Sequence, residues 1–231
     1  MKTKSKVLLG ISGALLLVAG SVAGTLAFLT ASESVTNVFT IGKVALTLDE
    51  AVVDSDGKAI DAENQRSGEG NEYHLVPGKR YDKDPTITVS EDSEEAYVRM
   101  MLTVTKASVI QEIIDNDAAL EDYADLFDGW DDTVWLYKGF TENKSEDSIT
   151  FEFRYADKVS GMAGEQKLAP LFTELVAPGS ITGEQMNELY TNDGNDDNDF
   201  KVIVEGHAIQ AVGFDTADAA WTAFKAQEQS E

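Results

Sequence analysis

Two histidines, His74 and His207, are the side chains in this sequence best suited to ligate a metal ion or to transfer a proton near neutral pH. Zinc proteases often carry the pattern HExxH, which places two histidines on one helical face with a glutamate base between them. Neither histidine lies in such a pattern, since His74 precedes a turn at Pro77 and Gly78 and His207 falls in a predicted strand. We interpret both as surface or strand residues; a site assembled from one histidine and distant carboxylates is the alternative.

Motifs for nucleophilic catalysis or phosphate binding are also missing. The sequence has no GxSxG elbow, and two histidines without a surrounding pattern do not define a catalytic triad. Cysteine is absent, which excludes a thiol nucleophile, a thiolate metal site and a disulfide framework. Gly68 and Gly70 lie in a polar loop that lacks the lysine of a phosphate-binding loop. The sequence therefore indicates no catalytic residue and no cofactor, and it favours a protein that is not an enzyme.

One polar loop has the alternating oxygen ligands with which calcium loops begin. The four residues are Asp193, Asn195, Asp197 and Asp199. The loop departs from an EF-hand, because Asn198 replaces the glycine of the sixth position and Val204 the glutamate of the twelfth. A solvated turn is the default interpretation, and a calcium site is the alternative.

The first 27 residues have the three parts of a secretory signal peptide. A lysine-rich start precedes an uncharged run over residues 7–22 and small residues up to Ala27. We predict that a signal peptidase cuts between Ala27 and Phe28, which leaves a secreted chain of 204 residues (231 − 27) in the extracellular matrix or at the cell surface. A membrane anchor is the alternative, since residues 7–32 carry no charge. No second apolar stretch follows, so we do not expect the mature form to span a membrane.

The mature chain is strongly acidic. Without the three lysines of the leader it has 15 basic (18 − 3) and 42 acidic residues, a formal charge of −27 (15 − 42). Such a surface repels phosphate backbones, which argues against nucleic acid as a partner. It also makes any self-association sensitive to salt and pH. A solvated acidic face without a specific role is the simpler interpretation of the same charge.

Period-2 alternation of apolar residues predicts that most of the mature chain is β-structure. The clearest strand covers residues 97–105, with its even-numbered side chains on one face. A hairpin-like turn is predicted at residues 54–57 and a polar connection at residues 139–147. Further strands are predicted at residues 43–48, 86–89, 133–137, 149–155 and 202–212.

Helical spacing is confined to three stretches. Residues 108–127 predict one or two short helices with a capping box at Ser108 and Gln111, and another short helix is predicted near Thr182. Residues 215–225 predict a terminal amphipathic helix with Trp221 and Phe224 on its inner face. Because strands and helices do not alternate regularly, we predict a mainly β fold. It is a jelly-roll-like β-sandwich, a single domain over residues 43–231 with a few inserted helices and a C-terminal helix.

Four segments together resemble the TasA and camelysin family. In order they read FLTASESVTNVFTIGKVALTLDE behind the leader, HLVPGKRYDKDPTITV, SEEAYVRMMLTV and FKVIVEGHAIQAVGFDTADAAW. The resemblance touches both ends and the middle and is weakest over residues 115–191. Family members are exported by Gram-positive bacteria and processed by a SipW-type signal peptidase. The resemblance implies a jelly-roll domain and, for TasA-like members, a subunit of extracellular fibres in the biofilm matrix.

The resemblance also implies how copies would join. In such fibres the freed N-terminal segment of one subunit fills a groove in the sheet of the next, an addition that rests on main-chain pairing at an exposed edge. Here the donor would be residues 28–42, and the partners would be further copies, with other matrix proteins or polysaccharide around them. An edge strand on its own chain, or a loose tail, is the alternative for this segment. The rival functions are a camelysin-like secreted metalloprotease and a monomeric surface adhesin or binding module.

Overall fold

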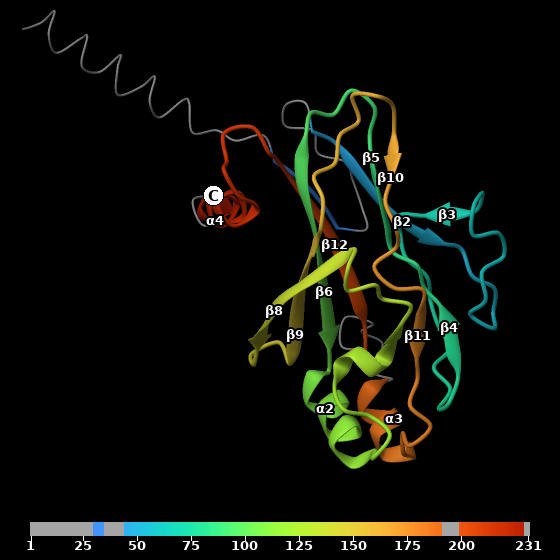
Figure 1. Cartoon of the computed structure of the whole chain (residues 1–231). Helices are drawn as coiled ribbons and strands as arrows, with labels where there is room; N and C mark the ends of the chain where they lie inside the picture. The colour runs from blue at the N-terminus through green and yellow to red at the C-terminus, as the bar shows by residue number, and fades with distance from the viewer. Residues whose placement is uncertain (1–29, 35–43, 191–198, 229–231) are drawn as a thin grey trace, which may run out of the picture.

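The computed structural model describes residues 30–34, 44–190 and 199–228, and the protein is mainly β in this part. The largest sheet is antiparallel, with the strand order β1-β12-β6-β9-β8. Figure 1 shows these strands side by side. Their bounds are β1 Thr30–Ser34, β12 Val202–Gln210, β6 Ala96–Thr105, β9 Ser148–Tyr155 and β8 Trp135–Asn143.

Two smaller antiparallel sheets complete the β-structure. One has the order β10-β5-β2-β3, with bounds Gln166–Lys167, Thr86–Val89, Leu46–Ala51 and Arg66–Ser67. The other has the order β4-β11-β7, with bounds Arg80–Asp82, Glu174–Val176 and Phe127–Asp128. The predicted fold class, a mainly β sandwich with a few short helices, is confirmed.

The helices lie at the margins of the sheets. α2 (Ala107–Asn116) and α3 (Gly183–Leu189) pack at one end, and α4 (Ala217–Glu228) stands beside the large sheet (Figure 1). A short 3-10 helix, η1 (Tyr123–Leu126), follows α2. Among the described residues, none of the helices is long and apolar enough to cross a membrane.

The main core lies between the five-stranded and the four-stranded sheets. β6 supplies Val98, Met100 and Leu102, which are buried against Leu46 and Ile87 of the other sheet. These β6 residues alternate as the sequence predicts, because successive side chains of a strand point to opposite faces. A second cluster joins the outer end of the sandwich to the buried faces of α2 and α3.

Two local predictions are wrong. Ser108 does not cap α2: the N-cap is Lys106, in the left-handed region at φ 54°, without a side-chain cap bond. Ser108 instead donates to Asp147 through its backbone N–H and its hydroxyl. The polar connection predicted over residues 139–147 also starts later than expected, because β8 continues to Asn143. The short helix predicted near Thr182 is confirmed as α3, and Thr182 forms a capping box with Gln185 at its start.

Candidate functional site

β1 forms one edge of the five-stranded sheet, and it is the described part of the predicted donor segment. It runs antiparallel to β12, in a register that pairs Thr30 with Ile209 and Ser34 with Glu205. β12 pairs along its other side with β6. Residues 30–34 are therefore an edge strand on their own chain. The other residues of segment 28–42, and the predicted cleavage point at Ala27 and Phe28, lie outside the described residues.

β12 lies where the two main sheets approach each other closely. A Cβ atom at Gly206 would come within 3.0 Å of Ile87 Cδ1 and 3.6 Å of Leu46 Cδ1. The neighbouring Ala208 is fully buried in the same core. The inner face of β12 is thus tightly packed. This packing holds in a fixed position the backbone edge with which β1 pairs.

The opposite face of β12 carries His207, which sequence analysis singled out. The strand register places it directly across from Arg99 of β6. Arg99 Nε donates a hydrogen bond to His207 Nδ1 at 3.0 Å. His207 is only 8% exposed, and burial, followed by the positive charge of Arg99, lowers its pKa to about 3. The imidazole is therefore neutral at physiological pH.

α4 covers this histidine and the arginine beside it. The guanidinium carbon of Arg99 lies 4.6 Å from the ring centroid of Trp221 and 4.7 Å from that of Phe224. The ring of Phe224 also stacks on His207, with 5.1 Å between centroids. Both aromatic residues are buried, as the amphipathic pattern of the C-terminal helix predicts. The contact of this desolvated cation with both aromatic rings helps to fix α4 on the sheet.

A groove of about 390 Å³ opens on the same face beyond α4. Glu152 lies in its wall and meets three cations, since it accepts from Arg154 Nε at 2.7 Å and lies 3.7 Å from Arg99 Nη1 and from Lys225 Nζ. Among other residues, the groove is lined by Met101, Thr103, Thr150 and the exposed Phe140. Its polar lining and open shape could hold an extended ligand, and no acid–base pair aimed into it is evident from these contacts.

The two histidines do not come together in one site. His74 is exposed in the segment before β4, whereas His207 is held by Arg99 on the large sheet. Within the described ranges, no group of three or more histidine, cysteine, aspartate or glutamate residues is placed to hold a metal ion. Asp193, Asn195 and Asp197 lie outside these ranges. Asp199 lies within them, and its carbonyl accepts a hydrogen bond from the Thr105 hydroxyl at 3.2 Å.

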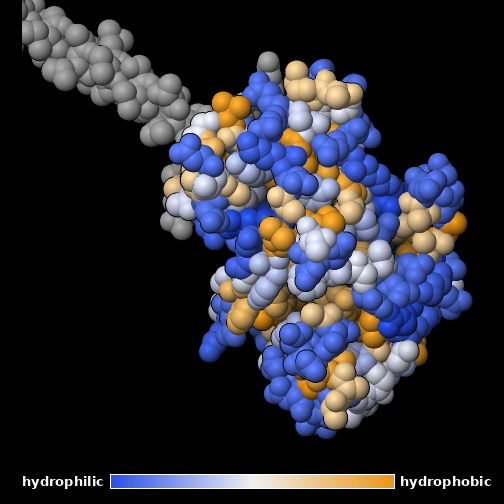
Figure 2. Space-filling view, viewed as in Figure 1, coloured by the Kyte–Doolittle hydropathy of each residue, from blue (hydrophilic) through white to orange (hydrophobic). Residues whose placement is uncertain are grey.

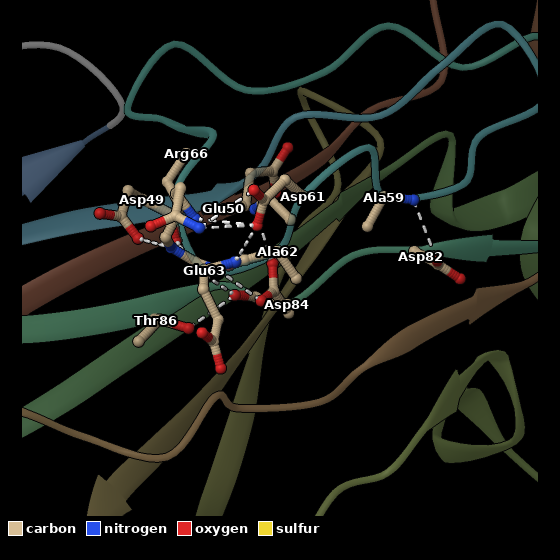
Figure 3. Close-up of polar contacts among 12 residues, drawn as sticks. Asp49, Glu50, Ala59, Asp61, Ala62, Glu63, Arg66, Asp82, Asp84 and Thr86 are labelled. Atoms are coloured by element: carbon tan, nitrogen blue, oxygen red, sulfur yellow. Dashed lines mark hydrogen bonds and ion pairs between the residues drawn. The ribbon is translucent and has the colours of Figure 1, made fainter.

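Sequence analysis missed an arginine whose hydrogen bonds hold together the long connection between β2 and β5. Arg66 donates through Nε to Asp49 at 2.6 Å and through Nη1 to Asp84 at 2.7 Å (Figure 3). It also donates to the carbonyl of Ala62 at 2.8 Å. The partners lie up to 18 residues away, so no local pattern marks them. Such forked donation to two carboxylates suits a structural clamp.

The visible surface in Figure 2 is mostly hydrophilic, with apolar residues in small separate patches. No protein-family model, curated protein or solved structure matches the chain. The assignment of a function must therefore come from the sequence and from the geometry of β1, β12 and the face beneath α4.

Proposed function

We propose that this protein is an exported, non-enzymatic structural subunit that joins copies of itself into cell-surface or matrix fibres by exchange of β1. The observation that carries the proposal is the position of β1. It begins two residues after the predicted cleavage point at Phe28, and it occupies the edge of β12 in an antiparallel register of five residue pairs. Release of the leader frees the chain end next to this strand.

Exchange would preserve the pairing that β1 already makes. The edge of β12 would receive the same five residues from a neighbouring copy, so the hydrogen bonds lost within one chain are regained between two. The segment from Ser34 to Val44 contains ten peptide steps and can extend to roughly 35 Å. A tether of this length permits β1 to reach another copy. A head-to-tail contact of this kind generates an open filament instead of a closed ring.

The acidity of the chain bears on the conditions for assembly. Subunits with a formal charge of −27 (15 − 42) repel each other, and dissolved salt screens this repulsion over about 10 Å at 0.1 M. Fibre growth should therefore accelerate as the salt concentration rises from low values. Polymerisation driven by backbone pairing survives at high salt, whereas contacts made by surface ion pairs weaken.

The test compares chains of different N-terminal length by electron microscopy and light scattering. The chain beginning at Phe28 should form filaments, and a chain beginning at Lys43 should remain monomeric. Ser32→Pro in the longer chain is the matched control, because it keeps the length and charge of the segment and removes a backbone donor in the middle of β1. Filaments from all three chains, or from none of them, would contradict the proposal.

A monomeric binding module is the second candidate, and the groove beside α4 is the observation that favours it. The groove combines threonine hydroxyls, charged side chains and the exposed ring of Phe140, a lining that suits a polar polymer such as a polysaccharide. On this account the chain beginning at Phe28 stays monomeric and binds its ligand equally well with or without residues 28–42. Sedimentation with insoluble polysaccharides, run on both chains, separates the two candidates.

A further inference from the structure

A buried lysine and a buried glutamate meet a half-buried asparagine of the connection between β3 and β4. Lys83 and Glu50 are 7% and 5% exposed, and Lys83 Nζ donates a short hydrogen bond to Glu50 Oε2. Asn71 Nδ2 donates to the other oxygen, Glu50 Oε1, at 2.8 Å. One carboxylate thus holds the amine of Lys83 and the amide of Asn71 next to each other. Neither the fibre proposal nor the clamp at Arg66 uses these three residues.

The orientation of the asparagine is fixed by its hydrogen bonds. Nδ2 also donates to the carbonyl of Ala51 at 2.8 Å, and Oδ1 accepts from the backbone N–H of Val53 at 3.1 Å. Exchanging the amide nitrogen and oxygen would oppose acceptor to acceptor at Glu50 and Ala51, so only one orientation fits. The Val53 N–H therefore points at the atom on which negative charge would develop if a nucleophile attacked Asn71 Cγ.

The amine of Lys83 lies beside an aromatic ring. Lys83 Nζ lies 5.9 Å from the ring centroid of Tyr73, and that ring packs edge-on against Tyr81 with 5.5 Å between centroids. Burial, followed by the nearby charge of Glu50, raises the pKa of Tyr73, so its hydroxyl stays neutral and donates to the carbonyl of Asp82 at 2.9 Å. The short hydrogen bond between Nζ and Oε2 places Glu50 where it can accept a proton from the amine.

We propose that Lys83 and Asn71 become joined by an intramolecular amide bond, with Glu50 as the catalytic acid and base. Nζ attacks Cγ of Asn71, and the electron pair of the carbonyl moves to Oδ1, where the Val53 N–H stabilises it. Collapse of this intermediate forms the Nζ–Cγ bond and breaks the Cγ–Nδ2 bond. Nζ loses two protons in all. Glu50 passes one of them to Nδ2, so that ammonia leaves, and the second proton converts this ammonia to ammonium. The exchange of one amide for another needs no oxidant or co-reactant.

The bond would cross-link this chain covalently, which a disulfide cannot do here because the sequence contains no cysteine. It would close the loop between residues 71 and 83 and tie it beside β2 through Glu50. Closing a loop reduces the conformational freedom of the unfolded chain. The linked protein should therefore unfold at a higher temperature than an unlinked one.

The test is mass spectrometry of the secreted, wild-type chain. The intact mass should be lower by one ammonia, about 17 Da, than the sequence requires, and digestion should release one branched peptide that contains both Lys83 and Asn71. A succinimide at Asn71 gives the same loss without a branched peptide, and a Lys83–Glu50 amide loses water instead; either product would overturn the proposal. So would the full mass in folded wild-type protein after prolonged incubation. This wild-type result decides the question whether or not a variant folds.

Variants assign the roles. Glu50→Gln and Asn71→Ala should each restore the full mass expected for the variant chain and should melt at a lower temperature. Lys58→Ala and Asn64→Ala are the matched controls, since both side chains are exposed in the neighbouring connection between β2 and β3 and make contacts with other partners. They should retain the branched peptide. A branched peptide that persists in folded Glu50→Gln would remove Glu50 from the reaction.

Discussion

The neutral, buried state of His207 predicts how the free energy of unfolding depends on pH. In the fold its pKa is about 3, whereas an unperturbed histidine titrates near 6.5. Between these values the unfolded chain binds a proton that the folded chain does not, so stability is lost as the pH falls below about 6.5. Since each pH unit corresponds to 1.36 kcal/mol, the loss reaches about 2 kcal/mol at pH 5 and roughly 4 kcal/mol near pH 3, where the folded histidine is itself half protonated.

The assay is urea unfolding of the wild-type chain and of His207→Gln at pH 7.5 and at pH 5. A glutamine can still accept a hydrogen bond from Arg99 but does not titrate. The variant should be the less stable protein at pH 7.5, because it gives up the stacking on Phe224. The difference between the two proteins should shrink by about 2 kcal/mol at pH 5, while the contribution of the carboxylates cancels in the comparison.

His74→Gln is the matched control, since the chain contains two histidines and His74 is exposed. It should follow the wild-type stability at both pH values. A difference between wild type and His207→Gln that is the same at pH 7.5 and pH 5 would refute the placement of a neutral His207 beneath α4. So would a pH-dependent difference of the same size in His74→Gln.

Three further changes test other parts of the structure by chemical unfolding. Trp221→Ala should cost about 3–5 kcal/mol, because it empties the buried contact of α4 with Arg99, whereas the exposed Thr222→Ala should cost under about 1 kcal/mol; equal losses would contradict the docking of α4. Gly161→Ala should cost at least about 1–3 kcal/mol, since the new Cβ would lie 1.9 Å from the Ser90 carbonyl oxygen, while Gly183→Ala has open space and should be nearly neutral. Arg66→Met should cost about 2–3 kcal/mol by leaving Asp49 and Asp84 without their donor, and Arg66→Lys should recover only part of it; full recovery by lysine would show that the forked geometry is unimportant.

Where the sequence carried a regular pattern, the fold followed it. The alternation in residues 97–105 predicted β6 and its buried face, and the spacing of Trp221 and Phe224 predicted the inner face of α4. The prediction stopped β8 too early because this strand lies at the sheet edge. Most of its side chains beyond Trp135 are exposed, so burial imposes no alternation on residues 138–143.

The candidate sites were harder to predict because they depend on contacts between distant residues. Arg99 and His207 meet only through the register of β6 and β12, at a sequence separation of 108 residues. Lys83, Glu50 and Asn71 likewise come from a strand and two connections, and none of them stands in a recognisable motif. The cap of α2 failed for a similar reason, since Asp147 from the β8–β9 turn takes the hydrogen bonds of Ser108.

The absence of cysteine allows the central claim, exchange of β1, to be tested with one engineered disulfide. Ala31 and Ala208 are paired in register across β1 and β12, so Ala31→Cys with Ala208→Cys in the chain beginning at Phe28 can lock β1 onto its own chain. Oxidation of monomers should abolish filaments and reduction should restore them, whereas oxidation of finished filaments should yield a covalent ladder of linked subunits. Filaments that grow equally well from oxidised monomers, or that give no ladder, would contradict donor-strand assembly.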